Sequence, residues 1–182
     1  TTKYTGVELT GLAGSLTGLG ADFVFQVSGV NVLVNQVSDL SAKLNWGALG
    51  TVAGASFTAA LDANVDLQAT GAMSMNLYGF VMAKGSFDIY KGSVTANDGA
   101  TALTNAQALT VSLSSVAVFV GVGGVLDGGA SATLVTDDTL VTTDAIGFDV
   151  TVTALNLALV TQGTTKYTGV ELTGLDGSLT GL

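Results

Sequence analysis

Apolar and polar residues alternate along three long stretches of the chain. In each stretch, three alternating apolar residues are followed by a gap of two residues and then by three more. The apolar positions are Phe23, Phe25, Val27, Val30, Val32 and Val34 in the first stretch, Leu109, Val111, Leu113, Val116, Val118 and Val120 in the second, and Phe148, Val150, Val152, Leu155, Leu157 and Leu159 in the third. Alternation of this length is typical of half-buried β-strands. The sequence therefore predicts an all-β protein.

The two-residue gap has two structural explanations. A tight hairpin needs backbone conformations with positive φ and favours glycine or asparagine, whereas a β-bulge inserts one extra residue into a continuous strand. The Ser-Ser pair at 114–115 and the Thr-Ala pair at 153–154 are poor hairpin residues, because β-branched Thr and Ala resist positive φ. We therefore expect long strands bent at a bulge in these two stretches, and the Ser-Gly pair at 28–29 leaves both explanations open.

Shorter patterns complete the expected secondary structure. Further strands are predicted at residues 55–61, 64–69, 73–82, 86–95 and 132–136. Turn residues lie at 97–99 (Asn-Asp-Gly), 127–129 (Asp-Gly-Gly) and 137–138 (Asp-Asp). Residues 38–44 are the one stretch that could form a short helix, which Trp46-Gly47 would end.

The expected architecture follows from the spacing of these strands. The strand units begin at uneven intervals, near Phe23, Phe87, Leu109 and Phe148, whereas the coils of a β-solenoid have nearly constant length. The sequence therefore favours long bent antiparallel strands in a sandwich or barrel-like repeat that stacks end to end. A β-solenoid is the alternative.

The first nineteen residues recur near the other end of the sequence. Residues 1–19 and 164–182 match at every position except one, where Ala13 corresponds to Asp176. Self-similarity at a fixed period, here 163 residues, is the sequence signature of a repeat protein. We therefore interpret residues 1–163 as one complete β repeat unit and residues 164–182 as the first segment of the next. The alternative is one domain with matching terminal segments.

The tandem interpretation predicts the conformation of the two copies. Both should be strand at the junction between units, with position 13 facing solvent because it accepts both Ala and Asp. Their apolar side chains should be buried, namely Val7, Leu9, Leu12 and Leu16 in one copy and Val170, Leu172, Leu175 and Leu179 in the other.

Composition excludes several classes of function. Fourteen acidic residues against five lysines give a net charge of −9, so no cationic cluster can displace counterions from nucleic acid. The sequence contains no His and no Cys, which are the usual general base, thiolate nucleophile and transition-metal ligands. The longest apolar run, residues 116–126, is too short and too rich in glycine for a transmembrane helix. We expect neither an enzyme, nor a nucleic-acid partner, nor a transmembrane segment.

Carboxylates are the remaining candidates for chemistry. Asp127, Asp137, Asp138 and Asp144 lie close together in the sequence beside two glycines, and calcium binds several such oxygen ligands. They are a candidate calcium site, although the EF-hand spacing is absent. The alternative is that they are solvated turn residues, as we expect for Asp98.

Three further aspartates could in principle supply the two carboxylates of a glycosidase. Asp62, Asp66 and Asp88 flank predicted strands, but such a pair acts only at a defined separation, among sugar-binding aromatic residues. One Trp and four Tyr in the whole chain give this little support. We expect no catalytic residues. Lys84 and Lys91, which border Phe87, are expected to protect a sheet edge from unwanted pairing.

The quoted patterns carry a family resemblance. The runs GFDVTVTALNLALV (147–160), ALTVSLSSVAVFVGVGGVLDG (108–128) and VELTGLAGSLTGL (7–19) resemble the repeats of giant bacterial surface or secreted, adhesin-like proteins. The resemblance implies an extracellular or cell-surface structural role, with adjacent copies of the repeat as partners. Two alternatives remain: a module that binds a glycan or another surface ligand, and a subunit that polymerises by strand exchange.

Overall fold

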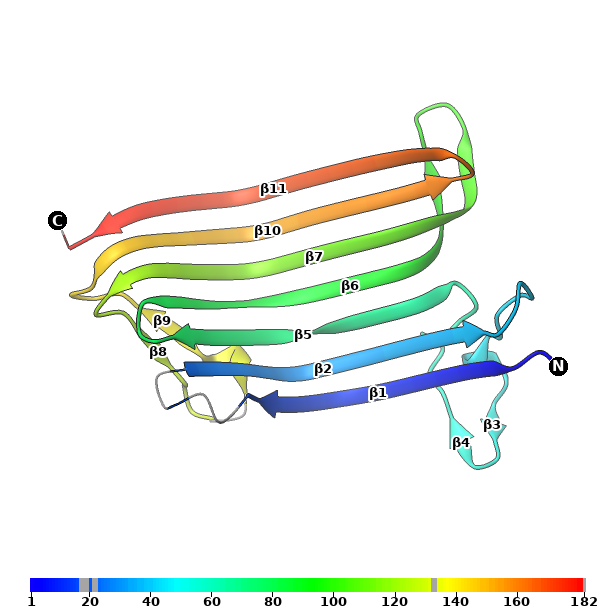
Figure 1. Ribbon diagram of the computed structural model, residues 1–182, viewed down its shortest axis with the longest axis horizontal. Coiled ribbons are helices and arrows are strands. Elements are labelled where there is room, and N and C mark those ends of the chain that lie inside the picture. The colour runs from blue at the N-terminus through cyan, green and yellow to red at the C-terminus, as the bar shows by residue number, and fades with distance from the viewer. Residues whose placement is uncertain (17–19, 21–22, 132–133, 182) are drawn as a thin grey trace.

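One seven-stranded antiparallel sheet dominates the computed structural model, which describes residues 1–16, 20, 23–131 and 134–181. The strand order is β1-β2-β5-β6-β7-β10-β11, with β1 and β11 at the two edges (Figure 1). The strands are β1 (Tyr4–Ser15), β2 (Phe23–Val37), β5 (Val65–Leu77), β6 (Val81–Asn97), β7 (Ala102–Val122), β10 (Ile146–Gln162) and β11 (Thr165–Thr180). The prediction of an all-β fold with long antiparallel strands is confirmed, and the sheet is not closed into a barrel.

The two-residue gaps lie inside continuous strands. In β7, Ser115 takes a φ of +51° within a strand that runs from Ala102 to Val122, and β10 continues past Thr153. The bulge interpretation is therefore confirmed for the second stretch, because the pairing of β7 with β6 shifts between Lys84 and Ser86. In the third stretch the strand is continuous as expected, but the pairing of β10 with β7 and β11 shows no shift at Thr153, so the bulge expected there is not found. The open case is also a bulge, because the pairing of β2 with β5 shifts between Ser28 and Asn31.

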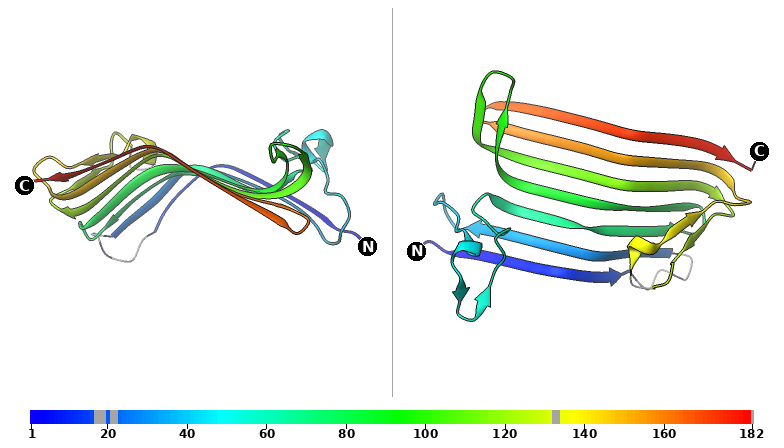
Figure 2. Two further views of the ribbon diagram at one scale, coloured as in Figure 1. Left: turned by 90° about the horizontal axis from the view of Figure 1, so that it is seen from above. Right: turned by 180° about the vertical axis from the view of Figure 1, so that it is seen from behind.

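These irregular positions lie opposite one another across the sheet. Gly11 in β1 and Gly174 in β11 adopt φ values of +66° and +60°, and Gly29 in β2 adopts +59°. Ser115 lies between these edges, opposite Thr153 of β10. Because β1, β2, β7 and β11 all deviate from regular strand geometry near the same level, the sheet bends near the middle of its strands, as the edge-on view shows (Figure 2, left).

Several shorter predictions differ from the structure. The strand expected at 73–82 contains a hairpin turn instead, because Tyr78 and Gly79 both take positive φ, +55° and +70°. Asn76 stabilises this turn by accepting a 2.8 Å hydrogen bond from the Gly79 amide. The sequence analysis missed it because Tyr-Gly is not among the usual turn pairs.

The remaining local predictions were partly right. The strand at 64–69 belongs to β5 and that at 86–95 to β6, but only Ala55–Ser56 (β4) of 55–61 is strand. Within 132–136, residues 132–133 lie outside the described residues and the 3₁₀ helix η2 (Val135–Asp137) replaces the expected strand. No helix forms at 38–44; a short 3₁₀ helix, η1 (Trp46–Ala48), follows it.

The register gives the sheet one apolar and one polar face. Side chains alternate between the faces, and paired residues share a face. β5 carries the same alternation unbroken from Leu67 to Leu77, which connects the two halves of the bent sheet. The apolar face consists of the alternating positions already named in β2, β7 and β10, of Leu67, Ala69, Met73, Met75 and Leu77 in β5, of Val81, Ala83, Phe87 and Ile89 in β6, and of Val7, Leu9, Leu12, Val170, Leu172, Leu175 and Leu179 at the edges.

Two excursions of the chain cover parts of the polar face, one at each end of the strands (Figure 2, right). The first, residues 38–64, contains η1, β3 (Thr51–Val52) and β4, and buries Leu33, Leu61 and Val65 against Trp46. The second, residues 123–145, contains β8 (Val125–Asp127), η2 and β9 (Thr139–Val141). It covers a second cluster: Met82, Phe119 and Ala145, with Leu126 and Leu140.

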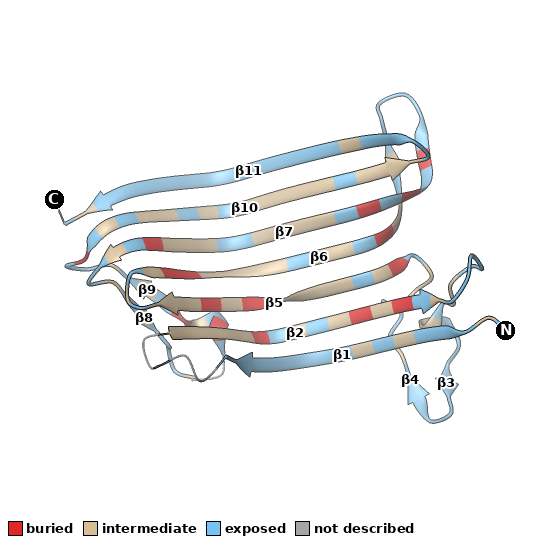
Figure 3. Ribbon diagram, in the orientation of Figure 1, coloured by how far each residue is buried: buried red, intermediate tan, exposed pale blue. Residues whose placement is uncertain are grey.

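The apolar side chains of the two terminal copies are exposed, so their predicted burial is wrong. In the first copy the exposed fractions run from 36% at Val7 to 51% at Leu16, and in β11 from 48% at Leu172 to 67% at Val170. Figure 3 shows β11 as exposed along most of its length. The alternation had identified the apolar face correctly, but within the described residues no part of the chain lies over it. Among those residues no helix is long and apolar enough to cross a membrane.

Candidate functional site

The two sheet edges are formed by the repeated sequence. Residues 4–15 form β1 and the corresponding part of 164–182 lies in β11, so both copies are strand, as predicted. Both contain the same backbone irregularity, with positive φ at Gly11 and at its counterpart Gly174. Ala13 and Asp176 are both exposed, which confirms the expectation for position 13. The two copies therefore share one strand conformation, including the positive φ at this glycine, although only β1 shows a register shift there.

The copies use opposite edges of this common strand. Every neighbouring pair in the seven-stranded sheet is antiparallel, so the first and seventh strands run in the same direction. Val7 and Val170 also point to the same face. With direction and face identical, β1 bonds β2 across one edge while β11 bonds β10 across the other. A single copy of this strand could therefore pair with β10 of one unit and β2 of the next at the same time.

The outer edges of β1 and β11 are unpaired in the described part of the chain. Each presents a row of backbone N–H and C=O groups, which is a template for the addition of another strand. Their charged side chains are few: Lys3 and Glu8 beside and in β1, and Lys166, Glu171 and Asp176 in β11.

β1 makes contacts that β11 lacks. The indole ring of Trp46 lies directly against Gly6, so close that a Cβ there would lie 2.6 Å from Trp46 Cε2. Trp46 Nε1 also donates a 3.0 Å hydrogen bond to Asn35 Oδ1. Glu8 accepts hydrogen bonds from the amide and the hydroxyl of Thr58, at 2.8 and 2.6 Å. All of these partners come from β2 and the excursion 38–64.

The counterparts in β11 have open surroundings. A Cβ at Gly169 would have no heavy atom within 4 Å, and Glu171 accepts one 3.2 Å hydrogen bond from Asn156 of β10. The sequence analysis missed the role of Trp46 and Glu8. In the sequence, Gly6 and Glu8 recur as Gly169 and Glu171, and the chain contains one Trp. No local pattern, however, indicates that residue 46 contacts residue 6.

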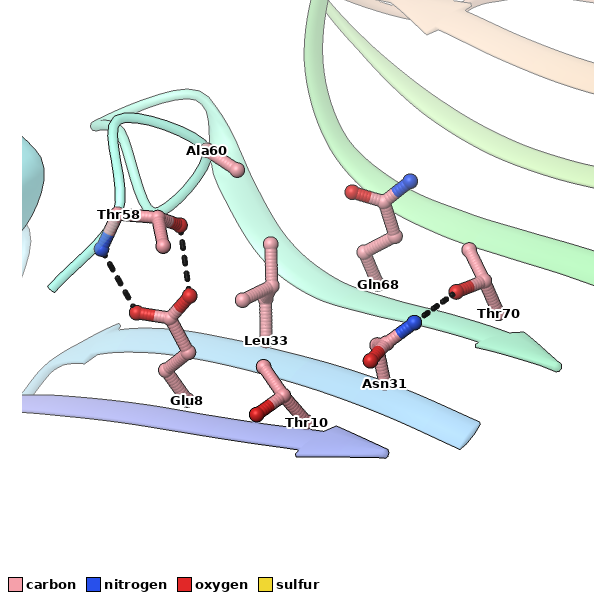
Figure 4. A pocket seen from close by; sticks show the side chains of 8 residues that line it. All are labelled: Glu8, Thr10, Asn31, Leu33, Thr58, Ala60, Gln68 and Thr70. Atoms are coloured by element: carbon pink, nitrogen blue, oxygen red, sulfur yellow. Dashed lines mark hydrogen bonds between the residues drawn. The ribbon is translucent and has the colours of Figure 1, made fainter. Parts of the chain in front are cut away.

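A shallow pocket of about 240 Å³ lies on the polar face beside the first excursion (Figure 4). Its lining residues are Glu8, Thr10, Asn31, Leu33, Thr58, Ala60, Gln68 and Thr70. Both carboxylate oxygens of Glu8 are bonded to Thr58, and Asn31 Nδ2 donates to Thr70 Oγ1 at 3.3 Å. These polar groups are already paired with one another, so the pocket offers few unpaired groups to a ligand.

The structure does not bring the candidate calcium ligands together. Asp127 Oδ1 accepts from the Gly129 amide at 3.2 Å, and Asp137 Oδ2 accepts from the amides of Ala130 and Ser131 at 3.1 and 3.0 Å. Asp144 is exposed, with a φ of +62°. No three acidic side chains converge within the described residues. Calcium binding at Asp127, Asp137, Asp138 and Asp144 therefore stays a prediction without a cluster to support it.

Asp138 differs from the expected solvated turn residue. It is 2% exposed and lies within the second excursion, where its backbone carbonyl accepts a hydrogen bond from Lys84 Nζ of the sheet. Lys84 and Lys91 do not protect an edge, because β6 is an inner strand between β5 and β7. Lys84 instead attaches the excursion to the polar face of the sheet.

The other aspartates are occupied by local structural contacts. Asp66 pairs with Lys43, Asp62 Oδ1 accepts from the Asn64 amide at 2.7 Å, and Asp88 accepts from Gln68 at 3.3 Å. Burial raises the pKa of the Tyr90 hydroxyl, and the nearby charges of Asp62 and Asp66 raise it further.

Asp98 is the turn residue that the sequence predicts. Its Oδ1 accepts hydrogen bonds from the amides of Ala100 and Thr101, at 2.9 and 2.7 Å, and these bonds lower the pKa of its carboxyl group below 3.8.

Comparison with models of protein families, with curated proteins and with solved structures finds no match to this chain.

Proposed function

We propose that this chain is a structural repeat of an extracellular filament, in which successive units share one continuous β-sheet. The single observation that carries the proposal is the equivalence of the two edges: β1 and β11 have nearly the same sequence, the same conformation and direction, and opposite unpaired edges. Shifting the unit by six strands places β1 on β11. β11 would then serve as the first strand of the next unit.

This arrangement defines the geometry of the filament. Neighbouring strands in a sheet lie about 4.8 Å apart, so six strands per repeat advance the sheet by about 29 Å. The strands would run across the filament axis, and the 163-residue sequence period would equal one structural period. An unpaired edge would remain only at the first and last units, which reduces the surface open to aggregation.

Chains of one, two and three consecutive 163-residue units test the proposal by small-angle X-ray scattering and electron microscopy. We expect the particle to lengthen by about 29 Å per added unit at constant width. Separate particles joined by flexible links, or growth along the strand direction, would contradict a shared sheet. The same proposal includes the cell-surface location and adhesive role that the family resemblance implies. Testing these two parts requires the native filament rather than isolated repeat units.

A strand-exchanging homopolymer is the second candidate, and the same edge equivalence favours it. β11 of one chain could replace β1 beside β2 of another, because both copies present the same side chains to the sheet. Mass measurement of the native filament after denaturation separates the two. A homopolymer would release short chains of one size, whereas a tandem array would release chains of many repeats.

A further inference from the structure

The apolar face of the sheet is the largest feature that the filament model does not use. It spans all seven strands and carries Val, Leu, Ile, Phe, Met and Ala at successive positions. Both excursions lie on the other face, where they cover Phe119 and Leu33. In the described residues neither excursion covers the apolar face; at one end of it, Phe23 packs against Tyr78 of the turn between β5 and β6.

The size of this face exceeds what a monomer normally leaves in water. Seven strands spaced by about 4.8 Å, with about twelve residues each at roughly 3.3 Å, give an area on the order of 1,100 Å². Exposed apolar patches on soluble monomers are usually a few hundred Å². A stable protein–protein interface needs about 800 Å² on each partner, so this face is large enough to form one.

The distribution of charge indicates which partner fits. The carboxylates at paired positions of the sheet, Glu8, Asp88, Asp149, Glu171 and Asp176, all lie on the polar face. Lys91 and Lys166 are at one end of the apolar face, whose centre carries no charge. Surfaces that bind lipid usually combine their apolar residues with Trp or Tyr and with many cations. Neither Trp nor Tyr occupies a paired position of this face, where Tyr78 of the β5–β6 turn contacts Phe23 at one end, and the chain has a net charge of −9 and so lacks the cations of such a surface.

A second copy of the chain meets these conditions. Two sheets that pack face to face lie about 10 Å apart, so the carboxylates of both copies would point outward from the pair. Charges separated by more than about 8–10 Å are largely screened at physiological salt, so the two acidic surfaces would repel each other weakly. Both sheets have the same twist, which is the condition for aligned face-to-face packing of two sheets.

We propose that two copies of this chain pack apolar face to apolar face and form a β-sandwich whose polar faces are outside. The interface is isologous: the same patch on each copy contacts its equivalent on the other. The proposal does not depend on the tandem filament, since it uses the face of the sheet rather than its edges. In a filament with a continuous sheet, the same face would continue from unit to unit and pair two ribbons along their length.

Sedimentation velocity of the chain, with two matched variants in β7, tests the proposal. Leu113 lies on the apolar face, and its neighbour Ser112 lies on the polar face opposite Asp88. We expect the unmodified chain to sediment with an apparent molecular mass of about twice the 18.1 kDa of one chain. Leu113→Lys should weaken the dimer at least about tenfold, because it places a charge in the centre of the interface, and Ser112→Lys should leave the dimer intact.

Thiol protection provides a second measurement if Leu113→Lys does not fold. The chain contains no cysteine, so a single introduced thiol reports on one position. The thiol introduced by Leu113→Cys should react slowly with a soluble maleimide and that of Ser112→Cys rapidly, with the difference lost on dilution to monomer. A monomer at all soluble concentrations, a dimer unaffected by Leu113→Lys, or protection that appears only when phosphatidylcholine vesicles are added would overturn the proposal.

Discussion

β1 and β11 are nearly the same strand in two different surroundings. β1 lies beside β2 and the excursion 38–64, so that Trp46 packs on Gly6 and Thr58 binds Glu8. β11 lies beside β10, where Gly169 has no neighbour within 4 Å and the apolar side chains are more exposed than in β1. The two sets of contacts are complementary rather than conflicting, because they use opposite edges of the strand.

This difference shows which features of the strand follow from its own sequence and which depend on the residues packed against it. The positive φ at Gly11 and Gly174 persists in both surroundings, so it follows from the local sequence and from the bend of the sheet. The cover over Gly6 depends on residues about forty positions further along the chain, and β11 would acquire it only from a following unit. The comparison therefore predicts that a substitution in β1 has a larger effect than the same substitution in β11, until another unit follows.

Removal of the cover over β1 should have the largest effect. Trp46 packs on Gly6 and Phe57 and donates a hydrogen bond to Asn35. Trp46→Ala should lower the free energy of unfolding by about 3 kcal/mol, as expected for loss of a large packed aromatic side chain. Amide hydrogen exchange should accelerate in β1 and remain unchanged in β11. Equal acceleration in both strands would show that the excursion does not distinguish them.

Substitution of alanine for the repeated glycine, at residue 6 in β1 and at residue 169 in β11, gives a matched pair of variants. Gly6→Ala should destabilise the chain by about 1–3 kcal/mol, because the new Cβ overlaps the Trp46 ring. Gly169→Ala should change the free energy of unfolding by less than about 0.5 kcal/mol, because the space there is open. Chemical denaturation measures both effects.

The same pair becomes a test of the shared sheet when a second unit is added. In a chain of two consecutive units, residue 169 would lie under the Trp of the following unit. Gly169→Ala should then become as destabilising as Gly6→Ala. If it stays neutral in the longer chain, β11 does not serve as the first strand of the next unit.

The repeated glutamate should show a smaller contrast. Glu8→Gln removes the charge and one of the two oxygens that bind Thr58, and it should cost about 1 kcal/mol. Glu171→Gln weakens one 3.2 Å hydrogen bond that the exposed Glu171 accepts from Asn156, so it should be neutral within about 0.5 kcal/mol. Thermal unfolding of the two variants side by side measures the difference. A larger effect at Glu171 would contradict the assignment of the covered strand.

Much of the sheet could be predicted from the sequence because its information is local. Period-two alternation identified β2, β7 and β10, and the poor turn chemistry at 114–115 and 153–154 correctly indicated that β7 and β10 continue through these pairs. The expected bulge is found in β7 but not in β10. The hairpin at Tyr78-Gly79 was missed because a tertiary context imposes positive φ on a residue that rarely adopts it.

The functional surfaces were harder to predict, because alternation gives the face of a side chain and not what lies against that face. The excursions cover the polar side, where the Val135 amide donates to Ser28, the Thr58 amide donates to Glu8, and the Asp138 carbonyl accepts from Lys84. The apolar side, expected to be the core, is left without cover in the described residues. The candidate aspartates show the same limit: proximity in the sequence placed Asp127 and Asp137 in one loop region, but Asp127 binds the amide of Gly129 and Asp137 binds the amides of Ala130 and Ser131.

The smallest expected effect concerns Thr2, which precedes β1, and its counterpart Thr165. Thr2 Oγ1 donates a 2.7 Å hydrogen bond to Asp39, and this bond, with those from Ser41, lowers the pKa of the exposed Asp39 carboxyl group below 3.8. A pKa lower in the folded than in the unfolded state means that the contribution to stability is present above pH 3.8 and is lost as the pH falls through the lowered pKa. Thr2→Val should therefore raise the pKa of Asp39 toward 3.8, whereas Thr165→Val should leave it unchanged. Carboxyl-carbon NMR titration measures both, and an Asp39 pKa that does not respond to Thr2→Val would show that this contact does not form in solution.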